Sequence, residues 1–345
     1  MSACALGIVL VACAGTREGL SGPEVIDLIV RNECAAAQLR GTPMLVALVE
    51  PGDTTYIRYP RGLDAAMLDA TTPVQLGAVT ASFFVPSFLE QLYAAKLTLD
   101  SVAIPVRSAD GRPMREITFA DLLLHRSDLP VVSLAAELSP LDQLLAVDRL
   151  LREQDPTELR GRYRYDHWNY TLAREALRTR LQGMLPLRAP ALAYNDRLPD
   201  STRAALGTTV ARAADAPRER QHPELFAAST AGVASTYELI ALLDSLSRAD
   251  LANLPEAPTL PDRPNMTVVP GWHKLALADG RAAWLSTGRT RRHAAAVAYF
   301  PATQTGVTVV ALDSKPLDCL ALDILRNLNR DWKRQPASDA PDTKR

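Results

Sequence analysis

The sequence predicts a mixed α/β protein of the α+β type, with an antiparallel sheet flanked by N- and C-terminal helices and a large inserted all-helical lobe. Three observations favour this fold. Strand patterns occur near the two ends of the chain, helical periodicity dominates from about residue 79 to 248, and an amphipathic pattern flanks the strands at each end. The two ends are therefore expected to build one sheet, with a cleft between sheet and lobe where a site would lie.

The expected elements follow in chain order. Apolar residues at helical spacing from Val25 to Leu39, with Pro23 near the start, predict a first amphipathic helix. The apolar run 43–49 and the β-rich run 54–59 predict two strands, and the Pro-Gly-Asp sequence between them predicts a hairpin turn. Later elements are strands at 268–277, 282–285, 294–300 and 307–312 and a last helix over about 317–332.

These patterns predict a single folded domain over residues 21–334. Its sheet lobe comprises about 21–77 and 250–334, and its helical lobe about 78–249. Residues 1–20 are expected to form a signal segment and linker. Residues 335–345 contain proline and aspartate but no apolar side chain larger than alanine, which is typical of a disordered tail.

Composition excludes several classes of protein. The 345 residues are 47% hydrophobic and 22% charged, which indicates a folded globular chain. Lys plus Arg number 38 against 39 Asp plus Glu, so there is no basic surplus for binding nucleic acid. The four cysteines form no CxxC pair and the five histidines no HExxH motif, so no metal and no cofactor is expected.

The N-terminus carries an apolar stretch over residues 3–14 that is too short for a membrane-spanning helix. It runs into Leu-Val-Ala-Cys-Ala-Gly at 10–15, which resembles a bacterial lipobox with Cys13 as the lipidated residue. This predicts a lipoprotein of the bacterial cell envelope, held in the periplasm through a lipid anchor in the membrane. No Lys or Arg precedes Arg17, so the alternative is an apolar N-terminus of a cytoplasmic protein.

Five sequence blocks carry the functional signal. They are Gln75–Phe84 followed by Lys96–Asp100, Ile117–Pro130 with His125, Ser127 and Asp128, Tyr165–Tyr170, Ala231–Leu239, and Ser286-Thr287-Gly288. In order and spacing they resemble the motifs of the serine β-lactamase and penicillin-binding-protein superfamily, especially its class C and esterase-like branch. The resemblance extends over roughly residues 40–330 and implies that superfamily's fold and a serine hydrolase ancestry.

The departures from the family pattern fall on the catalytic positions. A serine there attacks the carbonyl, and a lysine three residues later lies on the same helix face to accept its proton. Those positions are Ala78 and Ala81 in this chain. Alanine has neither a nucleophilic atom nor a proton acceptor, so the resemblance implies a site without acyl-enzyme chemistry.

Other changes agree with this interpretation. Ser286 replaces the basic residue of the last motif, and His167 replaces an asparagine that would bind a substrate amide. Arg289 follows Gly288, where small residues are common. The resemblance therefore places Tyr165, His167, Ser286 and Arg289 in a binding cleft, and only Tyr165 remains of the groups that handle charge.

Relocated catalysis is the competing hypothesis. Ser82 lies one turn deeper than Ala78 and is expected to bond back to a carbonyl of the preceding turn. The phenol of Tyr165 and the imidazole of His167 could act together as acid and base, but without a nucleophile the pair has nothing to activate. His125, Ser127 and Asp128 are too close in one loop to face each other, so a bridge between helix end and loop is expected.

Two functions follow. The first is a non-catalytic exported protein whose cleft binds a peptide or a peptidoglycan fragment. The second is a serine hydrolase with a rearranged active site, related to β-lactamases, D,D-peptidases or esterases. In the fold that the chain resembles, the first and last helices pack side by side, which makes Cys34 and Cys319 a disulfide candidate in an oxidising compartment, with two unpaired thiols as the alternative.

Overall fold

The structure is a computed structural model. It describes residues 39–60, 62, 67–107, 113–128, 163–181, 193–194, 229–230, 232–248, 254–257, 260, 265–277 and 279–329. The predicted signal segment with Cys13, the first helix with Cys34 and the tail 335–345 lie outside the described residues. Cys319 lies in the first turn of the last helix and is half-buried, so its pairing with Cys34 stays a prediction.

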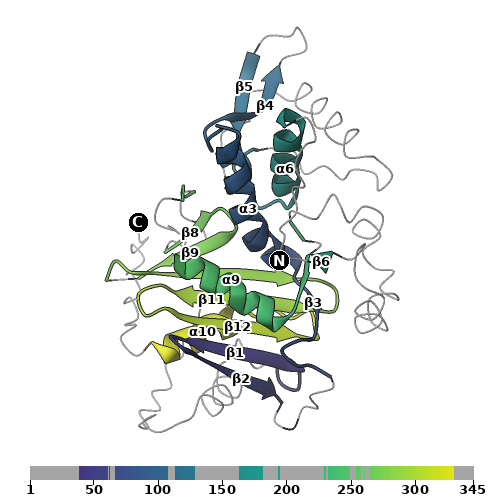
Figure 1. Ribbon diagram of the computed structural model, residues 1–345, viewed down its shortest axis with the longest axis vertical. Coiled ribbons are helices and arrows are strands. Elements are labelled where there is room, and N and C mark those ends of the chain that lie inside the picture. The colour runs from purple at the N-terminus through teal and green to yellow at the C-terminus, as the bar shows by residue number, and fades with distance from the viewer. Residues whose placement is uncertain are drawn as a thin grey trace, which may run out of the picture.

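A seven-stranded antiparallel sheet forms the lower lobe in Figure 1. Its strands, in spatial order, are β2 (Asp53–Tyr59), β1 (Met44–Glu50), β12 (Thr305–Ala311), β11 (Ala294–Phe300), β10 (Ala282–Arg289), β9 (Trp272–Ala276) and β8 (Met266–Val269). The N-terminal strand β1 pairs with the late strand β12, from Met44 opposite Ala311 to Val49 opposite Gly306. The two ends of the chain therefore build one sheet, as the sequence predicted.

Helices cover both faces of this sheet, which explains why its central strands are apolar on both sides. On one face, α10 (Asp318–Leu328) packs Leu320, Ile324 and Leu325 against the sheet. On the other face, α9 (Thr236–Arg248) contributes Leu239, Leu242, Leu243 and Leu246 to a second core. Strand β1 divides its side chains between the two, because Val46 belongs to the first core and Leu45 to the second.

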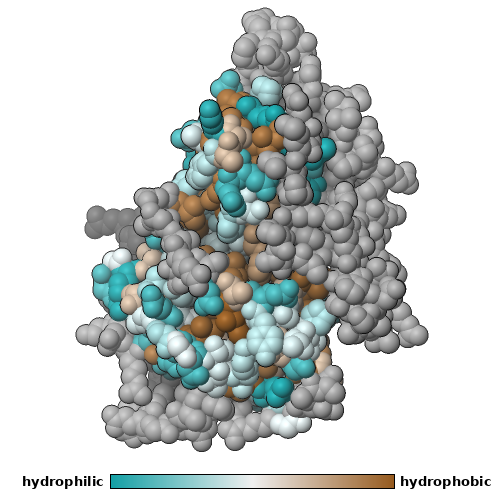
Figure 2. All heavy atoms as spheres, in the orientation of Figure 1, coloured by the Kyte–Doolittle hydropathy of each residue, from teal (hydrophilic) through white to brown (hydrophobic). Residues whose placement is uncertain are grey.

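The second lobe, at the top of Figure 1, contains α3 (Thr80–Ala94), α4 (Phe119–Leu123) and α6 (Trp168–Arg180). Aromatic side chains fill its core: Phe88 lies 5.7 Å from Phe119 and 5.3 Å from Phe84, measured between ring centroids. A 3₁₀ turn, η1 (Gly77–Val79), leads from the sheet into α3. Figure 2 shows apolar residues gathered where the two lobes meet on this face.

The prediction of an all-helical lobe was wrong. Strands β4 (Val102–Arg107) and β5 (Pro113–Thr118) form a hairpin within it, and β3 (Val74–Gln75), β7 (Gly232–Ala234) and β6 (Ala193–Tyr194) form a small sheet beside it. The hairpin has register irregularities between residues 102 and 107, around Pro105. Proline cannot donate to a strand ladder, so its presence weakened the strand pattern.

The single strand predicted over 268–277 is two strands, β8 and β9, joined at Pro270 and Gly271. Gly271 has φ +78°, a left-handed conformation that glycine adopts without steric cost. The sequence analysis joined the strand-forming residues on the two sides of Pro270 and Gly271 into one strand. This turn matters because it reaches α3 in the other lobe.

Candidate functional site

The family motif of residues 77–82 lies where η1 begins α3, against strand β10. Ala78 is partly exposed at the junction of the lobes. Ala81 is buried, with 7% of its surface exposed, and belongs to the apolar core of the upper lobe. Ala78 and Ala81, which the sequence analysis compared with the serine and the lysine of the family pattern, carry only methyl groups.

Backbone packs directly on backbone between η1 and β10. A Cβ atom on Gly288 would lie 1.9 Å from the Leu76 carbonyl oxygen and 2.6 Å from the Ala78 nitrogen. A Cβ atom on Gly77, which has φ +54°, would lie 2.6 Å from the Arg289 nitrogen. Because both contacts are to rigid backbone, neither position accepts a side chain without a shift of the strand or the turn.

Ser82 and Ser286 form a buried contact at this junction. The Ser82 Oγ lies 2.6 Å from the Ser286 Oγ and 2.7 Å from the Gly271 carbonyl oxygen. The carbonyl can only accept, so both contacts are satisfied when Ser82 donates to Gly271 and Ser286 donates to Ser82. Since the two serines are 0% and 4% exposed, the Ser82 hydroxyl is sealed from solvent.

The expected bond from Ser82 to the preceding turn is not formed. Thr80 makes that bond instead: its Oγ1 donates to the Gly77 carbonyl at 2.6 Å and accepts from the Gly232 N–H at 3.0 Å. Ser82 reaches across to a turn 189 residues away, because Gly271 lets the β8–β9 turn approach α3 closely. No local sequence pattern could predict this partner.

The chain of hydrogen bonds continues into the upper lobe. The Gly271 N–H donates to the Tyr170 hydroxyl at 2.7 Å, and that hydroxyl donates to the Leu123 carbonyl at 3.1 Å. Burial raises the pKa of the Tyr170 phenol well above its ordinary value. It therefore stays protonated at neutral pH and links α6 to the end of α4 and to the β8–β9 turn.

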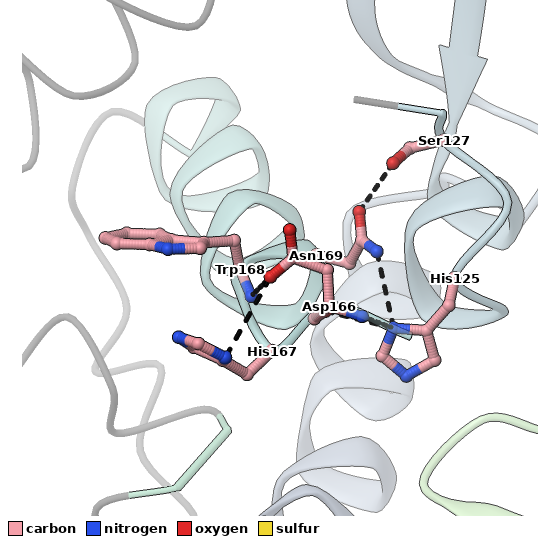
Figure 3. Close-up of polar contacts among 6 residues, drawn as sticks. All are labelled: His125, Ser127, Asp166, His167, Trp168 and Asn169. Atoms are coloured by element: carbon pink, nitrogen blue, oxygen red, sulfur yellow. Dashed lines mark hydrogen bonds and ion pairs between the residues drawn. The ribbon is translucent and has the colours of Figure 1, made fainter. Parts of the chain in front are cut away.

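His125 and Ser127 bridge the end of α4 to the start of α6, as predicted. The His125 Nδ1 lies 3.0 Å from the Asp166 carbonyl oxygen, and Ser127 donates to the Asn169 Oδ1 at 2.6 Å (Figure 3). Burial lowers the pKa of the His125 imidazole to about 3, with the neighbouring His273 and His167 adding to the effect. The ring is therefore neutral at physiological pH, and its surroundings are the rings of Tyr163, Tyr165 and Tyr170.

In the segment before α6, Tyr165, Asp166 and His167 differ in their exposure to solvent. Tyr165 is 50% exposed, while Asp166 is only 8% exposed and its Oδ1 accepts the Trp168 N–H at 2.9 Å. His167 stacks on Trp168 with ring centroids 5.9 Å apart, and its side chain is 43% exposed. Figure 3 shows both rings beside the first turn of α6.

Tyr165 is poorly suited to act as a base. Although half of its surface is exposed, desolvation of the remainder raises the pKa of its phenol to about 12, and Tyr163 and Asp166 add to this rise. The phenol is therefore protonated at neutral pH.

Arg289 does not accompany Ser286. Strand alternation places Ser286 on the face of Trp284, towards α3, and Arg289 on the opposite face with Leu285. The arginine is exposed and Thr287 is partly exposed. The placement of Arg289 in the cleft, inferred from the motif, is therefore not supported by the strand geometry.

Sequence reasoning overlooked Asp166, Tyr170 and Gly271. An aspartate two residues before a helix is a recognisable capping signal, and Pro270-Gly271 is a recognisable turn signal. Within the described residues, no group of histidine, cysteine, aspartate or glutamate side chains is arranged to hold a metal ion. No helix there is long and apolar enough to span a membrane.

Solved structures show what this fold is similar to. A class C β-lactamase from Rhodobacter sphaeroides is 15% identical with a TM-score of 0.59, over 88% of this chain and 99% of that one. A β-lactamase/D-alanine carboxypeptidase from Pseudomonas syringae is 16% identical with a TM-score of 0.58, over 90% and 99%. An octameric penicillin-binding protein homologue from Pyrococcus abyssi is 14% identical with a TM-score of 0.62, over 93% and 80%.

These likenesses confirm the fold that the motifs predicted: the chain has the fold of the serine β-lactamase and penicillin-binding-protein superfamily. No family model and no curated protein sequence matches the chain. At this level of identity the likeness establishes the architecture, while activity has to be argued from the residues of the site.

The buried His125 generates a prediction about pH. An unfolded histidine titrates near pH 6.5, whereas the pKa of His125 in the folded protein is about 3, so only the unfolded chain takes up this proton between these two pH values. The stabilisation is fully present above about pH 6.5 and is lost as the pH falls, at up to about 1.4 kcal/mol per pH unit. Free energies of unfolding should therefore fall more steeply for the wild type than for His125→Asn between about pH 7 and pH 5.

Asparagine is the matched replacement because residue 125 has φ +55°, which asparagine tolerates better than most residues. The variant will be less stable at neutral pH, since it loses the ring contacts. The informative quantity is the stability difference between the two proteins, which should shrink on acidification. A difference that stays constant over this range would contradict the account of His125.

Proposed function

We propose that the chain is a non-catalytic member of the β-lactamase and penicillin-binding-protein fold, an exported protein whose cleft binds a peptide or a cell-wall fragment. The observation that carries this proposal is chemical: the motif positions of the nucleophile and its base are Ala78 and Ala81. Losing both groups of a serine hydrolase costs about a millionfold in rate, which leaves only binding.

The surroundings of these positions support the proposal. The nearest hydroxyl along α3, on Ser82, is fully buried and hydrogen-bonded to Gly271 and Ser286. A nucleophile must reach the substrate and a base together. Ser82 meets neither condition, because its neighbours are a carbonyl and a second neutral hydroxyl.

The alternative is a serine hydrolase-like enzyme with a rearranged active site. Its most accessible candidate is the half-exposed Tyr165 beside His167. The raised pKa of Tyr165, about 12, disfavours the phenolate that such chemistry would need. The two functions differ in one observable, the formation of a covalent adduct.

Acylation provides that test. Purified protein treated with a penicillin or a fluorophosphonate should show no mass increase in intact-mass spectrometry, because residue 78 has no oxygen to acylate. A serine hydrolase in the same tube verifies that the probe is active. An adduct of stoichiometric yield on any residue of the cleft, mapped by peptide sequencing, would establish the rearranged enzyme instead.

A restored variant serves as the matched comparison. Ala78→Ser with Ala81→Lys is expected to fold, since residue 78 is partly exposed, although a lysine at the buried position 81 carries a desolvation cost. Little activity is expected from it, because Ser286 and His167 remain. Its adduct, where one forms, should be confined to residue 78.

Export and lipidation form a separate part of the proposal. They rest on the lipobox-like sequence at 10–15, with Cys13 as the lipid-bearing residue. Cells fed a labelled palmitate analogue should incorporate it into the wild type and not into Cys13→Ser, read out in the membrane fraction. Equal labelling of both proteins would exclude Cys13 as the anchor and leave the binding function untouched.

A further inference from the structure

Strand β2 forms an open edge of the seven-stranded sheet, four strands away from β10 (Figure 1). The opposite edge strand, β8, is covered, because the Ala257 N–H donates to the Val268 carbonyl at 2.8 Å and the Leu260 N–H donates to the Met266 carbonyl at 3.0 Å. No such bond joins the outer side of β2 to another part of the chain that the structure describes. A row of unpaired backbone N–H and C=O groups is a template for a further strand.

The β1–β2 hairpin determines which backbone groups of β2 point outward. Glu50 pairs with Asp53 across a two-residue turn, and the closing pair of such a turn is hydrogen-bonded. Hydrogen-bonded and non-hydrogen-bonded pairs alternate along an antiparallel ladder, so Thr54, Tyr56 and Arg58 direct their N–H and C=O groups away from β1. The Thr54 N–H donates to the exposed Asp53 Oδ1 at 2.8 Å, while those of Tyr56 and Arg58 have no partner among the described residues.

Strand β2 lacks two features that usually protect an edge. Its residues, 53–59, include no proline, and its register with β1 runs over seven consecutive pairs without a bulge. The strand carries two charged side chains, Asp53 and Arg58, and the Arg58 Nε donates to the Leu68 carbonyl at 3.1 Å. The edge is therefore regular over its whole length and able to continue the sheet.

An exposed aromatic pair lies beside this edge. Tyr56, at the centre of the strand, contacts Tyr237 of α9 edge-to-face, with ring centroids 5.9 Å apart. The two residues are 37% and 52% exposed, although rings of this size contribute most when they are buried at an interface. The acidic neighbour of Tyr237 is engaged locally, because Glu238 accepts hydrogen bonds from the N–H and the hydroxyl of Ser235.

We infer that β2 is a dimerisation edge, which pairs antiparallel with β2 of a second copy of this chain about a twofold axis at Tyr56. In this register Tyr56 faces its own copy and Thr54 faces Arg58 of the second copy, so all three outward-facing residues of both strands are engaged. A register centred on residue 55 would place Arg58 opposite Gly52 of the turn. A register centred on residue 57 would place Thr54 opposite Pro60, which has no N–H to donate.

The paired strands complement each other in charge and in aromatic surface. Across the axis Asp53 faces Tyr59 and Arg58 faces Thr54, so no like charges stand directly opposite each other. Ile57 belongs to the core on the α10 side, which places Tyr56 on the sheet face that α9 covers. Two exposed aromatic pairs therefore meet at the axis and bury one another, and the sheet continues from one copy into the next.

The oligomeric state of the full chain tests this edge. Sedimentation velocity over a range of concentrations should show a reversible monomer–dimer equilibrium with a Kd on the order of 100 μM or tighter, because one strand pair buries a small area. Tyr56→Lys places two like charges at the axis and should weaken the dimer at least about tenfold. A chain that stays monomeric over this range would overturn the inference.

A matched control separates the edge from a general effect of surface charge. Tyr93→Lys makes the same substitution at another exposed tyrosine, on α3 and outside the edge, and should leave the Kd of the dimer unchanged. Circular dichroism verifies that both variants fold. Equal weakening by Tyr56→Lys and Tyr93→Lys would overturn the inference.

Thiol cross-linking tests the register. The Cα atoms of the two residues 56 should lie about 5.5 Å apart, whereas those of the two residues 54 should lie about 14 Å apart, since four residues separate them along the strand. With a short thiol-specific cross-linker, Tyr56→Cys should therefore give a linked dimer and Thr54→Cys alone should not. A mixture of Thr54→Cys and Arg58→Cys should also give one.

The wild type, treated in the same way, gives the background from the native cysteines, and peptide mapping locates each bridge. The mixed design retains Tyr56, so it tests the pairing even where Tyr56→Cys itself weakens the dimer. Absence of a bridge between residues 54 and 58, or equal yields from the single Thr54→Cys and Tyr56→Cys proteins, would overturn the register and with it the inference.

A peptide is the competing occupant of this edge. A chain that stays monomeric while an alternating threonine–valine peptide shifts the Tyr56 and Tyr237 NMR signals would assign β2 to another partner and overturn the dimer. The inference is independent of the proposed function, because β2 lies four strands away from β10. A covalent adduct with the acylation probes would remove the proposed function and leave this edge unaffected.

Discussion

The contact of α3 with strand β10 is the constraint on which the site depends. Gly288 lies so close to η1 that a Cβ atom there would be 1.9 Å from the Leu76 carbonyl oxygen. One turn further into the helix, Ser82 and Ser286 meet in a buried hydrogen bond that also engages Gly271. These contacts hold α3, β10 and the β8–β9 turn together, and Ala78 lies partly exposed at the start of α3.

The contact between Ser82 and Ser286 is made by two neutral hydroxyl groups. Two hydroxyls satisfy each other and a carbonyl, so this part of the junction is stable without water, cation or ligand. Neutral groups also make the contacts in the upper lobe. The neutral His125 bonds to the segment before α6, and the protonated Tyr170 links α6 to α4 and to the β8–β9 turn.

The sequence predicted the parts of this arrangement that local pattern controls. Strands β1, β2 and β11 were found because their apolar runs are continuous or β-rich, and the motif blocks located Ala78, Ala81 and Ser286. The β4–β5 hairpin was missed because Pro105 interrupts its pattern. The bond between Ser82 and Ser286 joins residues 204 positions apart, and its geometry depends on where the β8–β9 turn approaches α3. Such contacts follow from tertiary packing and produce no periodic pattern in the sequence.

A double-mutant cycle on Ser82 and Ser286 tests the central claim most directly. The free energy of unfolding would be measured by chemical denaturation for the wild type, Ser82→Ala, Ser286→Ala and the double variant. Because each single change leaves the other hydroxyl buried with one partner fewer, the two effects should be coupled by about 1 kcal/mol, the double variant losing less than the sum. Strictly additive losses would contradict a buried pair of serines that satisfy each other at the junction of α3 and β10.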